Sequence, residues 1–159
     1  MTSNQTLHAT AVLIGAHAVL IRGPSGSGKS RLAFDLLQAA QNSSNATLPF
    51  ARLVGDDRVH VEAVGSRLLV RPAAALAGLL EVRGLGIRHL AYEPVAQVGL
   101  IVDLAASDAA RLPAEMAETT SISGVILPRL TVAPGEAALP LILAWLATQP
   151  VSPSAMSPD

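Results

Sequence analysis

The sequence has no cysteine, a single lysine and few aromatic residues. Without cysteine the chain cannot form a disulfide framework, a thiolate nucleophile or a thiolate metal site, and this composition agrees with a reducing compartment. Aromatic residues make up only 3% of the chain while hydrophobic residues make up 50%. The core must therefore be built of aliphatic side chains, and this apolar content excludes a disordered polymer.

The chain also lacks an excess of positive charge and a long apolar run. Eleven Lys and Arg residues against twelve Asp and Glu residues give a net charge of −1, so we expect no nucleic-acid partner. The apolar stretch 9–21 follows no basic residue and is interrupted by Gly15 and His17, which argues against a signal peptide. The run 139–147 is about half of the roughly 20 residues that a membrane span needs. We expect a soluble, cytoplasmic protein with no membrane partner.

Hydrophobic periodicity predicts one α/β domain over residues 1–148, with a mixed β-sheet, hairpins and flanking helices. Strands are expected at 8–14, 18–22, 52–55, 58–64, 67–70, 79–82, 98–104 and 125–132, the last at a sheet edge because Pro128 interrupts it. Helices are expected at 29–40 and 135–148. The second should turn Ala137, Ala138, Leu141, Ile142, Trp145 and Leu146 toward the sheet. We expect a loop at 41–49 and a disordered tail at 149–159.

A phosphate-binding loop (P-loop) lies between the second expected strand and the first expected helix. It matches G-x-x-x-x-G-K-[ST] with the residues Gly23, Pro24, Ser25, Gly26, Ser27, Gly28, Lys29 and Ser30. The glycines let backbone N–H groups surround a phosphate, the lysine reaches the β- and γ-phosphates, and the serine hydroxyl can bind Mg²⁺. Lys29 is the only lysine, and the other ten cationic residues are arginines, so the single compact ammonium group stands where a phosphate site needs one.

Two sets of carboxylates compete for the metal and for proton transfer. Asp103 ends an apolar strand and could hold Mg²⁺ through water. Asp56 and Asp57 follow another strand, and paired carboxylates can raise one another's pKa so that one acts as a base. Neighbouring side chains of a strand point in opposite directions, so a shared site requires a turn, which Gly55 permits. Two solvated aspartates in a turn are the plain alternative.

The segment 81–87, Glu-Val-Arg-Gly-Leu-Gly-Ile, is the third candidate feature. Glu81 and Arg83 share a face of a strand, and the glycines from Gly84 onward allow a close approach of backbone to a ligand. The plain alternative is an ion pair beside a turn.

Together these features resemble HPr kinase/phosphorylase, the bacterial enzyme family that phosphorylates, and in many members dephosphorylates, a serine of the phosphocarrier protein HPr. The resemblance extends from about His8 to Leu146. It depends on a histidine at the head of the first strand, the P-loop, Leu-Val-Gly-Asp-Asp at 53–57, and Leu-Glu-Val-Arg-Gly-Leu-Gly-Ile at 80–87. The last of these is close to a signature of that family.

The resemblance implies an ATP- and Mg²⁺-dependent protein-serine kinase with a role for each residue. Asp57 would accept the seryl proton and return it in the reverse reaction, with His8 beside the phosphate, although an ordinary strand histidine is the plain alternative for His8. Ser30 and Glu81 would hold Mg²⁺, Asp56 would support Asp57 or the metal, and Lys29 would bind the β-phosphate. Arg111 resembles the family's later catalytic arginine. Arg83 and Gly84 would support the site.

The chain departs from the family pattern in three places. Seven residues precede His8, so the chain resembles the truncated forms that have only the C-terminal catalytic domain. Arg31 replaces a usual glutamate, and Glu136 and Ala137 stand where the family has arginine and asparagine, residues tied to the reverse reaction. The resemblance also implies a homo-oligomer, a hexamer. The alternative functions are a nucleotide-binding switch or sensor and a kinase for a small metabolite.

Overall fold

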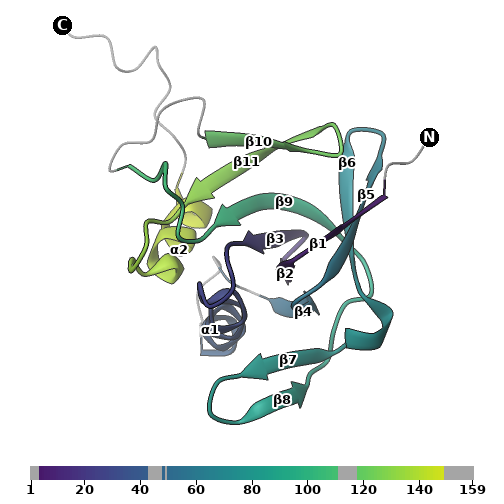
Figure 1. The fold of residues 1–159 in the computed structure, drawn as a ribbon, viewed down its shortest axis with the longest axis vertical. Coiled ribbons are helices and arrows are strands. Elements are labelled where there is room, and N and C mark those ends of the chain that lie inside the picture. Colours follow the sequence, from purple (N-terminus) through teal and green to yellow (C-terminus); the bar gives the residue numbers. More distant parts are fainter. Residues whose placement is uncertain (1–3, 43–47, 49, 111–117, 149–159) are drawn as a thin grey trace, which may run out of the picture.

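A curled, mixed β-sheet forms the body of the protein in the computed structural model, which describes residues 4–42, 48, 50–110 and 118–148 (Figure 1). The nine strands of this sheet are β1 (Asn4–Leu7), β2 (Ala9–Ile14), β3 (His17–Arg22), β4 (Ala51–Gly55), β5 (Val59–Val64), β6 (Arg67–Pro72), β9 (Ala96–Asp103), β10 (Thr119–Ile122) and β11 (Val125–Thr131). A separate hairpin consists of β7 (Leu79–Val82) and β8 (Gly86–His89), and the helices are α1 (Lys29–Asn42), the short 3₁₀ turn Ala74–Leu76 and α2 (Ala138–Ala147). The predicted α/β fold is confirmed.

The order of the strands places the functional loops at one end of the sheet. Seven strands follow the order β1-β5-β6-β9-β3-β2-β4, and β11 pairs with β9 and with β10. β3 and β11 are both parallel to β9, whereas the β2–β3 hairpin and the β5–β6 hairpin are antiparallel. Because β3, β9 and β11 run in the same direction, their carboxyl ends lie side by side. The P-loop begins at this end, directly after β3.

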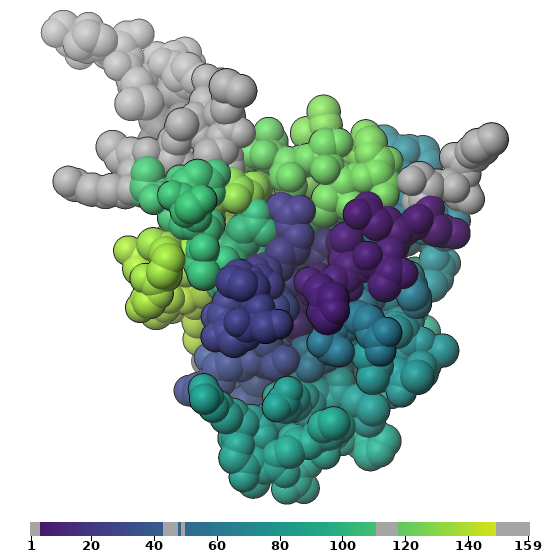
Figure 2. Space-filling view, in the orientation of Figure 1, coloured from purple at the N-terminus to yellow at the C-terminus, as the bar shows by residue number. Residues whose placement is uncertain are grey.

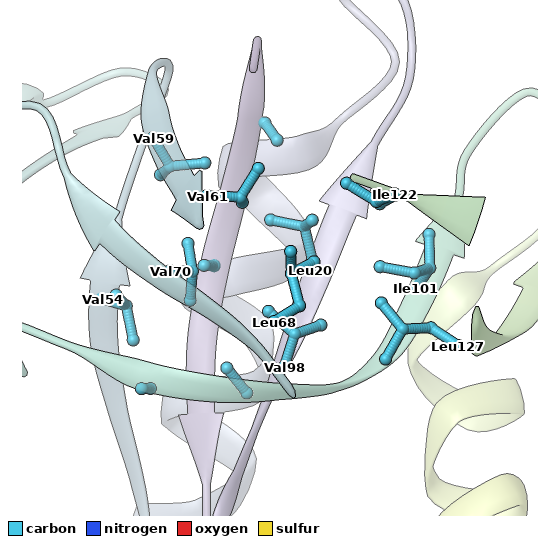
Figure 3. Close-up of a cluster of buried hydrophobic side chains, with 14 of the residues drawn as sticks. Leu20, Val54, Val59, Val61, Leu68, Val70, Val98, Ile101, Ile122 and Leu127 are labelled. Carbon is cyan, nitrogen blue, oxygen red and sulfur yellow. The ribbon is translucent and has the colours of Figure 1, made fainter. Parts of the chain in front are cut away.

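Two apolar clusters, one on each face of the sheet, form the core. The side chains of β2, β3 and β9 alternate between them, as a strand buried on both faces requires. The first cluster lies inside the curl of the sheet and includes Leu20, Val61, Leu68, Val98 and Ile101 (Figure 3). The second lies between the sheet and the two helices. Both clusters are almost entirely aliphatic, as the low aromatic content predicts.

Helix α1 packs its predicted face on the sheet. Leu32, Ala33 and Leu36 are buried in the second cluster, which also contains Leu80 of the β7–β8 hairpin. The hairpin therefore lies beside α1 at one end of the molecule (Figure 1). This packing brings the segment after residue 80 close to the P-loop at the head of α1.

Four expectations about the elements need correction. Strands β1 and β8 were not predicted, because β1 is a short polar strand and β8 is exposed along its whole length. Strand β11 is not at an edge: residues 125–128 pair with β10 and residues 129–131 pair with β9, so Pro128 lies where one partner replaces the other. In α2 only Ile142 is fully buried, while Leu141 and Trp145 are 37% and 40% exposed. Periodicity could not orient a helix that is apolar on all sides.

Some expectations fall outside the described residues. These are the tail at 149–159, the segment that contains Arg111 and most of the expected loop at 41–49. Residues 41 and 42, which were assigned to that loop, continue α1. Among the helices of the described part of the chain, none is long and apolar enough to cross a membrane.

Candidate active site

The P-loop curls tightly between β3 and α1. The backbone N–H of Ser27 donates to the carbonyl of Pro24 at 3.1 Å, and Leu32 N–H donates to Gly28 at 2.9 Å where the helix starts. At Gly23 a Cβ would lie 2.6 Å from Ser27 Oγ and 3.1 Å from Leu104 Cβ, so only glycine fits there. The loop therefore presents backbone N–H groups at the positive end of a helix dipole, a suitable site for a phosphate.

Lys29 is the first residue of α1 and folds back over the loop. Its Nζ donates to the carbonyls of Gly23 at 2.7 Å and Pro24 at 3.2 Å. The hydroxyl of Ser27 is buried and has no hydrogen-bond partner within the described residues. A buried hydroxyl without a partner is costly unless a ligand or water satisfies it, and a bound phosphate could do so.

Asp56 is the buried carboxylate at the centre of the site. Its Oδ1 accepts hydrogen bonds from Thr10 Oγ1 at 2.7 Å and from Ser30 Oγ at 2.8 Å, and its Oδ2 lies 2.9 Å from the same serine oxygen. The backbone N–H of Glu81 donates to Oδ2 at 3.4 Å. Asp56 thus joins β2, the P-loop and β7, and its partner Ser30 is the residue that the P-loop pattern assigns to Mg²⁺.

Asp57 occupies a strained turn and points into solvent. The N–H of Arg58 donates to the carbonyl of Asp56 at 2.8 Å, and Asp57 between them has φ +67°, the left-handed region that aspartate tolerates better than most residues. Its Oδ1 lies 3.7 Å from His8 Nδ1, and the two side chains are 63% and 73% exposed. The predicted turn is present, but the residue with the left-handed backbone is Asp57, not Gly55. Gly55 allows close packing instead, because a Cβ there would lie 2.8 Å from Val59.

A single open cavity of about 710 Å³ brings these groups together. Its walls come from the N-terminal strands, the P-loop and α1, the Asp56–Asp57 turn and the end of β7, segments that share one face of the molecule (Figure 2). The predicted residues in its lining are His8, Ser25, Gly26, Gly28, Lys29, Ser30, Asp56, Asp57, Glu81 and Arg83. Gly23, Pro24 and Ser27 belong to the loop behind the lining, and Arg111 lies outside the described residues.

Gly84 does not reach this cavity. It has φ +91° in the turn of the β7–β8 hairpin, which a hydrogen bond from Leu85 N–H to the Val82 carbonyl closes at 2.9 Å. Within the described residues no ion pair joins Glu81 to Arg83, so the plain alternative of an ion pair for these two is not supported.

The cavity wall also contains five residues that were not predicted as site residues: Thr10, Arg31, Phe34, Asp35 and Val82. Thr10 is fully buried and stands two residues after His8, so strand alternation could have indicated a shared face. No motif marks Phe34 or Asp35. Their place follows from the position of α1 beside the Asp56–Asp57 turn.

The oxygen atoms of Ser30, Asp56 and Glu81 could hold a divalent metal. Mg²⁺ prefers oxygen ligands and usually combines one or two carboxylates with water and substrate phosphate. The described residues contain no cluster of three or more His, Asp or Glu side chains that would form an all-protein metal site. The residues present therefore fit a metal that arrives with a nucleotide.

Asp103 lies outside the cavity and is bound by two arginines. Arg22 donates to it through Nε at 2.7 Å and Nη2 at 2.8 Å, and Arg129 donates to its Oδ2. Burial raises the pKa of Asp103, but the hydrogen bonds from Arg22 and Arg129 outweigh it and hold that pKa below its ordinary value. The geometry thus favours Asp56 and Glu81 over Asp103 as carboxylates for a metal.

The chain is similar to known proteins over most of its length. Residues 1–142 match the family described as the HPr serine kinase C-terminal domain. The chain is 34% identical over 144 residues to HPr kinase/phosphorylase of Limosilactobacillus reuteri (strain DSM 20016), covering 83% of this chain and 42% of that protein. It is 37% identical over 86 residues to HPr kinase/phosphorylase of Mycoplasma genitalium, covering 54% of this chain and 24% of that protein.

A solved structure has the same fold. The HPr(Ser) kinase/phosphatase of Coxiella burnetii superposes with a TM-score of 0.69 at 23% identity, covering 90% of this chain and 93% of that chain. The chain spans about two fifths of the length of the Limosilactobacillus relative. Since the family model covers nearly all of the chain, the protein belongs to the HPr serine kinase C-terminal domain family.

Proposed function

We propose that this domain is an ATP- and Mg²⁺-dependent protein-serine kinase that phosphorylates the phosphocarrier protein HPr in regulation of the bacterial phosphotransferase system. One observation supports this above others: a P-loop, a buried carboxylate bonded to its serine, and an exposed carboxylate–histidine pair line one open cavity. The opening matters because a hydroxyl on another protein must reach the exposed Asp57. We further propose that the domain assembles as a homo-oligomer, a hexamer, in the cytoplasm.

Asp57 acts as the general base. In the forward reaction the seryl oxygen bonds to the γ-phosphorus, the bond from that phosphorus to the β–γ bridging oxygen breaks, and ADP leaves. The seryl proton passes to the Asp57 carboxylate, while His8 beside it holds the transferring phosphoryl group. The exposed position of Asp57 lets it meet an incoming hydroxyl without touching the nucleotide.

The other residues of the cavity bind the nucleotide. Lys29 and the N–H groups of the P-loop hold its phosphates, and Lys29 exchanges its loop carbonyls for the β-phosphate. Ser30 and Glu81 hold Mg²⁺, with Asp56 orienting the serine hydroxyl. Bound Mg²⁺ neutralises charge that develops on the phosphate oxygens. We propose that Arg111 also stabilises the charge that develops on the phosphate oxygens, and that Arg83 supports the site from the wall of the cavity.

Incubation with γ-labelled ATP, Mg²⁺ and purified HPr tests the proposal. We expect acid-stable label on a serine of HPr, and we expect Asp57→Asn to lose at least about 10²-fold in rate because it keeps the shape of the side chain but removes the base. Glu62→Gln, on strand β5 and outside the cavity lining, is the matched control and should retain wild-type activity. Absence of labelled HPr with every preparation would refute the kinase assignment.

The second candidate is a nucleotide-binding switch or sensor, which would use the same P-loop without phosphotransfer. ATP binding without transfer to HPr would favour it, and label on a small molecule would favour a metabolite kinase. The exposed Asp57–His8 pair favours the protein kinase, because a sensor has no need for a base at the mouth of the cavity.

A further inference from the structure

Four charged side chains form a continuous network where three parallel strands end. Asp103, the last residue of β9, accepts two hydrogen bonds from Arg22 at the end of β3, one on each carboxylate oxygen. Arg129 of β11 donates to Oδ2 of the same carboxylate and places Nη1 2.7 Å from Asp108 Oδ2. Two positive and two negative groups thus neutralise one another, and both oxygens of Asp103 are occupied.

The backbone joins the same strand ends to the P-loop. Leu104 N–H donates to the carbonyl of Arg22 at 2.8 Å, and Val132 N–H donates to the carbonyl of Asp103 at 2.9 Å. The P-loop starts at the next residue, Gly23, where a Cβ would lie 3.1 Å from Leu104 Cβ and 3.2 Å from the Leu104 carbonyl. Leu104 thus packs beside Gly23 and is hydrogen-bonded to Arg22, so we expect a shift of the segment after β9 to displace the start of the P-loop.

We propose that Asp103 is a positioning residue for the P-loop: together with Arg22 and Arg129 it fixes the strand ends from which the loop begins, and it binds no metal. In many P-loop proteins an acidic residue at the end of a buried strand beside the loop helps to hold Mg²⁺. Here the residue in that position holds the strand ends in place. The inference rests on the proposed function, since its effect is measured at the nucleotide phosphates.

The chemistry of the network makes it rigid. A guanidinium that donates two parallel hydrogen bonds to a carboxylate fixes orientation as well as distance, which the single ammonium of lysine cannot do. Both aspartates stay ionised, because hydrogen bonds from Arg22 and Arg129 hold the pKa of Asp103, and a hydrogen bond from Arg129 that of Asp108, below the ordinary value. Removal of the Asp103 carboxylate takes away both hydrogen bonds of Arg22 and one of Arg129, which are partly buried, so the strand ends would have to rearrange.

Titration with a fluorescent ATP analogue, once with Mg²⁺ and once with EDTA, separates positioning from metal binding. We expect Asp103→Asn to weaken binding by about tenfold or more in both solutions, because a displaced loop misplaces its N–H groups whether or not a metal is present. The ratio of the two affinities should stay at the wild-type value. Glu81→Gln, which alters a proposed metal ligand, should reduce the affinity only with Mg²⁺ and so lower that ratio.

Two further variants and one nucleotide-free measurement complete the test. Arg22→Lys keeps the charge but not the paired hydrogen bonds, so it should weaken binding as Asp103→Asn does, and it replaces that variant if Asp103→Asn does not fold. Glu62→Gln breaks an ion pair of 3.0 Å with Arg71, outside the cavity lining, and should leave binding unchanged. Amide hydrogen exchange of residues 22–30 without nucleotide should be faster in Asp103→Asn and Arg22→Lys than in the wild type, and unchanged in Glu62→Gln.

The outcomes distinguish the hypotheses. Wild-type affinity and wild-type exchange of residues 22–30 in folded Asp103→Asn would overturn the inference, as would a loss of affinity confined to the Mg²⁺ solution, which would make Asp103 a metal ligand. If Asp103→Asn is less stable but its loop exchanges at the wild-type rate, the network has a purely structural role, and this result would also overturn the inference. If the wild-type protein binds no nucleotide, the proposed function fails and this inference fails with it.

Discussion

At the scale of single residues, Lys29 offers the simplest test of nucleotide binding. It is the only lysine, and its Nζ contacts two carbonyls of the loop instead of the apolar core. Lys29→Ala should therefore weaken ATP binding and abolish phosphotransfer while changing the free energy of unfolding by no more than about 0.5 kcal/mol. Calorimetric titration and a denaturant curve measure the two effects. Unchanged affinity and turnover would remove the P-loop from the mechanism.

The left-handed turn at Asp57 predicts a separation of stability from activity. Glycine adopts φ +67° without the strain of about 1–2 kcal/mol that a side chain adds, although its freer unfolded state offsets part of that gain. Asp57→Gly should therefore keep the stability of the wild type but lose at least about 10²-fold in turnover. Asp57→Val, with a branched side chain in the same turn, should unfold at lower denaturant concentration. Equal stability of the glycine and valine variants would contradict the strained turn.

Thr10 provides a residue-scale test of the Asp56 cluster. Its hydroxyl is fully buried and donates to Asp56 at 2.7 Å. Thr10→Val keeps the shape but removes the donor, which should cost about 1–3 kcal/mol of stability and raise the Mg²⁺ concentration needed for half-maximal nucleotide binding.

Thr10→Ser is the matched control because it retains the hydroxyl. It should restore the Mg²⁺ dependence of the wild type. If the valine and serine variants bind Mg²⁺ and nucleotide alike, the hydroxyl has no part in placing Asp56.

At the scale of elements, the sequence predicted best where two independent signals coincided. The P-loop motif and the amphipathic pattern of α1 agree, and Leu32, Ala33 and Leu36 are buried as expected. Pattern alone also found the strands at 52–55, 58–64, 67–70 and 79–82. It did not find β8, which has no buried face, and it could not show that Trp145 is 40% exposed, because α2 is apolar on all sides. Alternation along the strand could place Thr10 on the face of His8, but only the pairing of β2 with β4 brings it to Asp56, whereas Asp56 and Asp57 were found by their motif.

The network at the ends of β3, β9 and β11 predicts a dependence of stability on pH. The pKa of Asp103 is lower in the folded protein than its ordinary value, so the carboxylate contributes stability above that ordinary value, and the contribution is lost as the pH falls through the folded value. Asp108, held by Arg129, acts in the same direction.

The measurement is the free energy of unfolding of the wild type and of Asp103→Asn from about pH 6 to pH 2. The wild type should be more stable near pH 6, and the difference should shrink on acidification because only the wild type loses the ionised Asp103. A difference that stays constant with pH would show that the Arg22 and Arg129 hydrogen bonds do not favour the ionised form.

At the scale of the whole molecule, the charges around the cavity bear on the reverse reaction. There an oxygen of inorganic phosphate bonds to the phosphorus of phosphoserine, the bond to the seryl oxygen breaks, the serine takes back its proton, and pyrophosphate leaves. Two anionic groups must meet, so added positive charge should favour the step. Arg129 cannot supply it, because its guanidinium is bound to Asp103 and Asp108. Arg31 lines the cavity but pairs with Asp35 at 3.2 Å.

We therefore predict that phosphorolysis is weak while kinase activity is retained. Glu136 and Ala137, exposed residues just before α2, carry a negative charge and no side-chain amide, so neither helps phosphate to approach phosphoserine. Serine-phosphorylated HPr incubated with Mg²⁺ and millimolar phosphate should release pyrophosphate far more slowly than the forward reaction consumes ATP. The double variant Glu136→Arg, Ala137→Asn should raise that rate, whereas Arg129→Lys should not. Pyrophosphate release by the wild type as fast as the forward reaction would show that the acidic replacement is harmless.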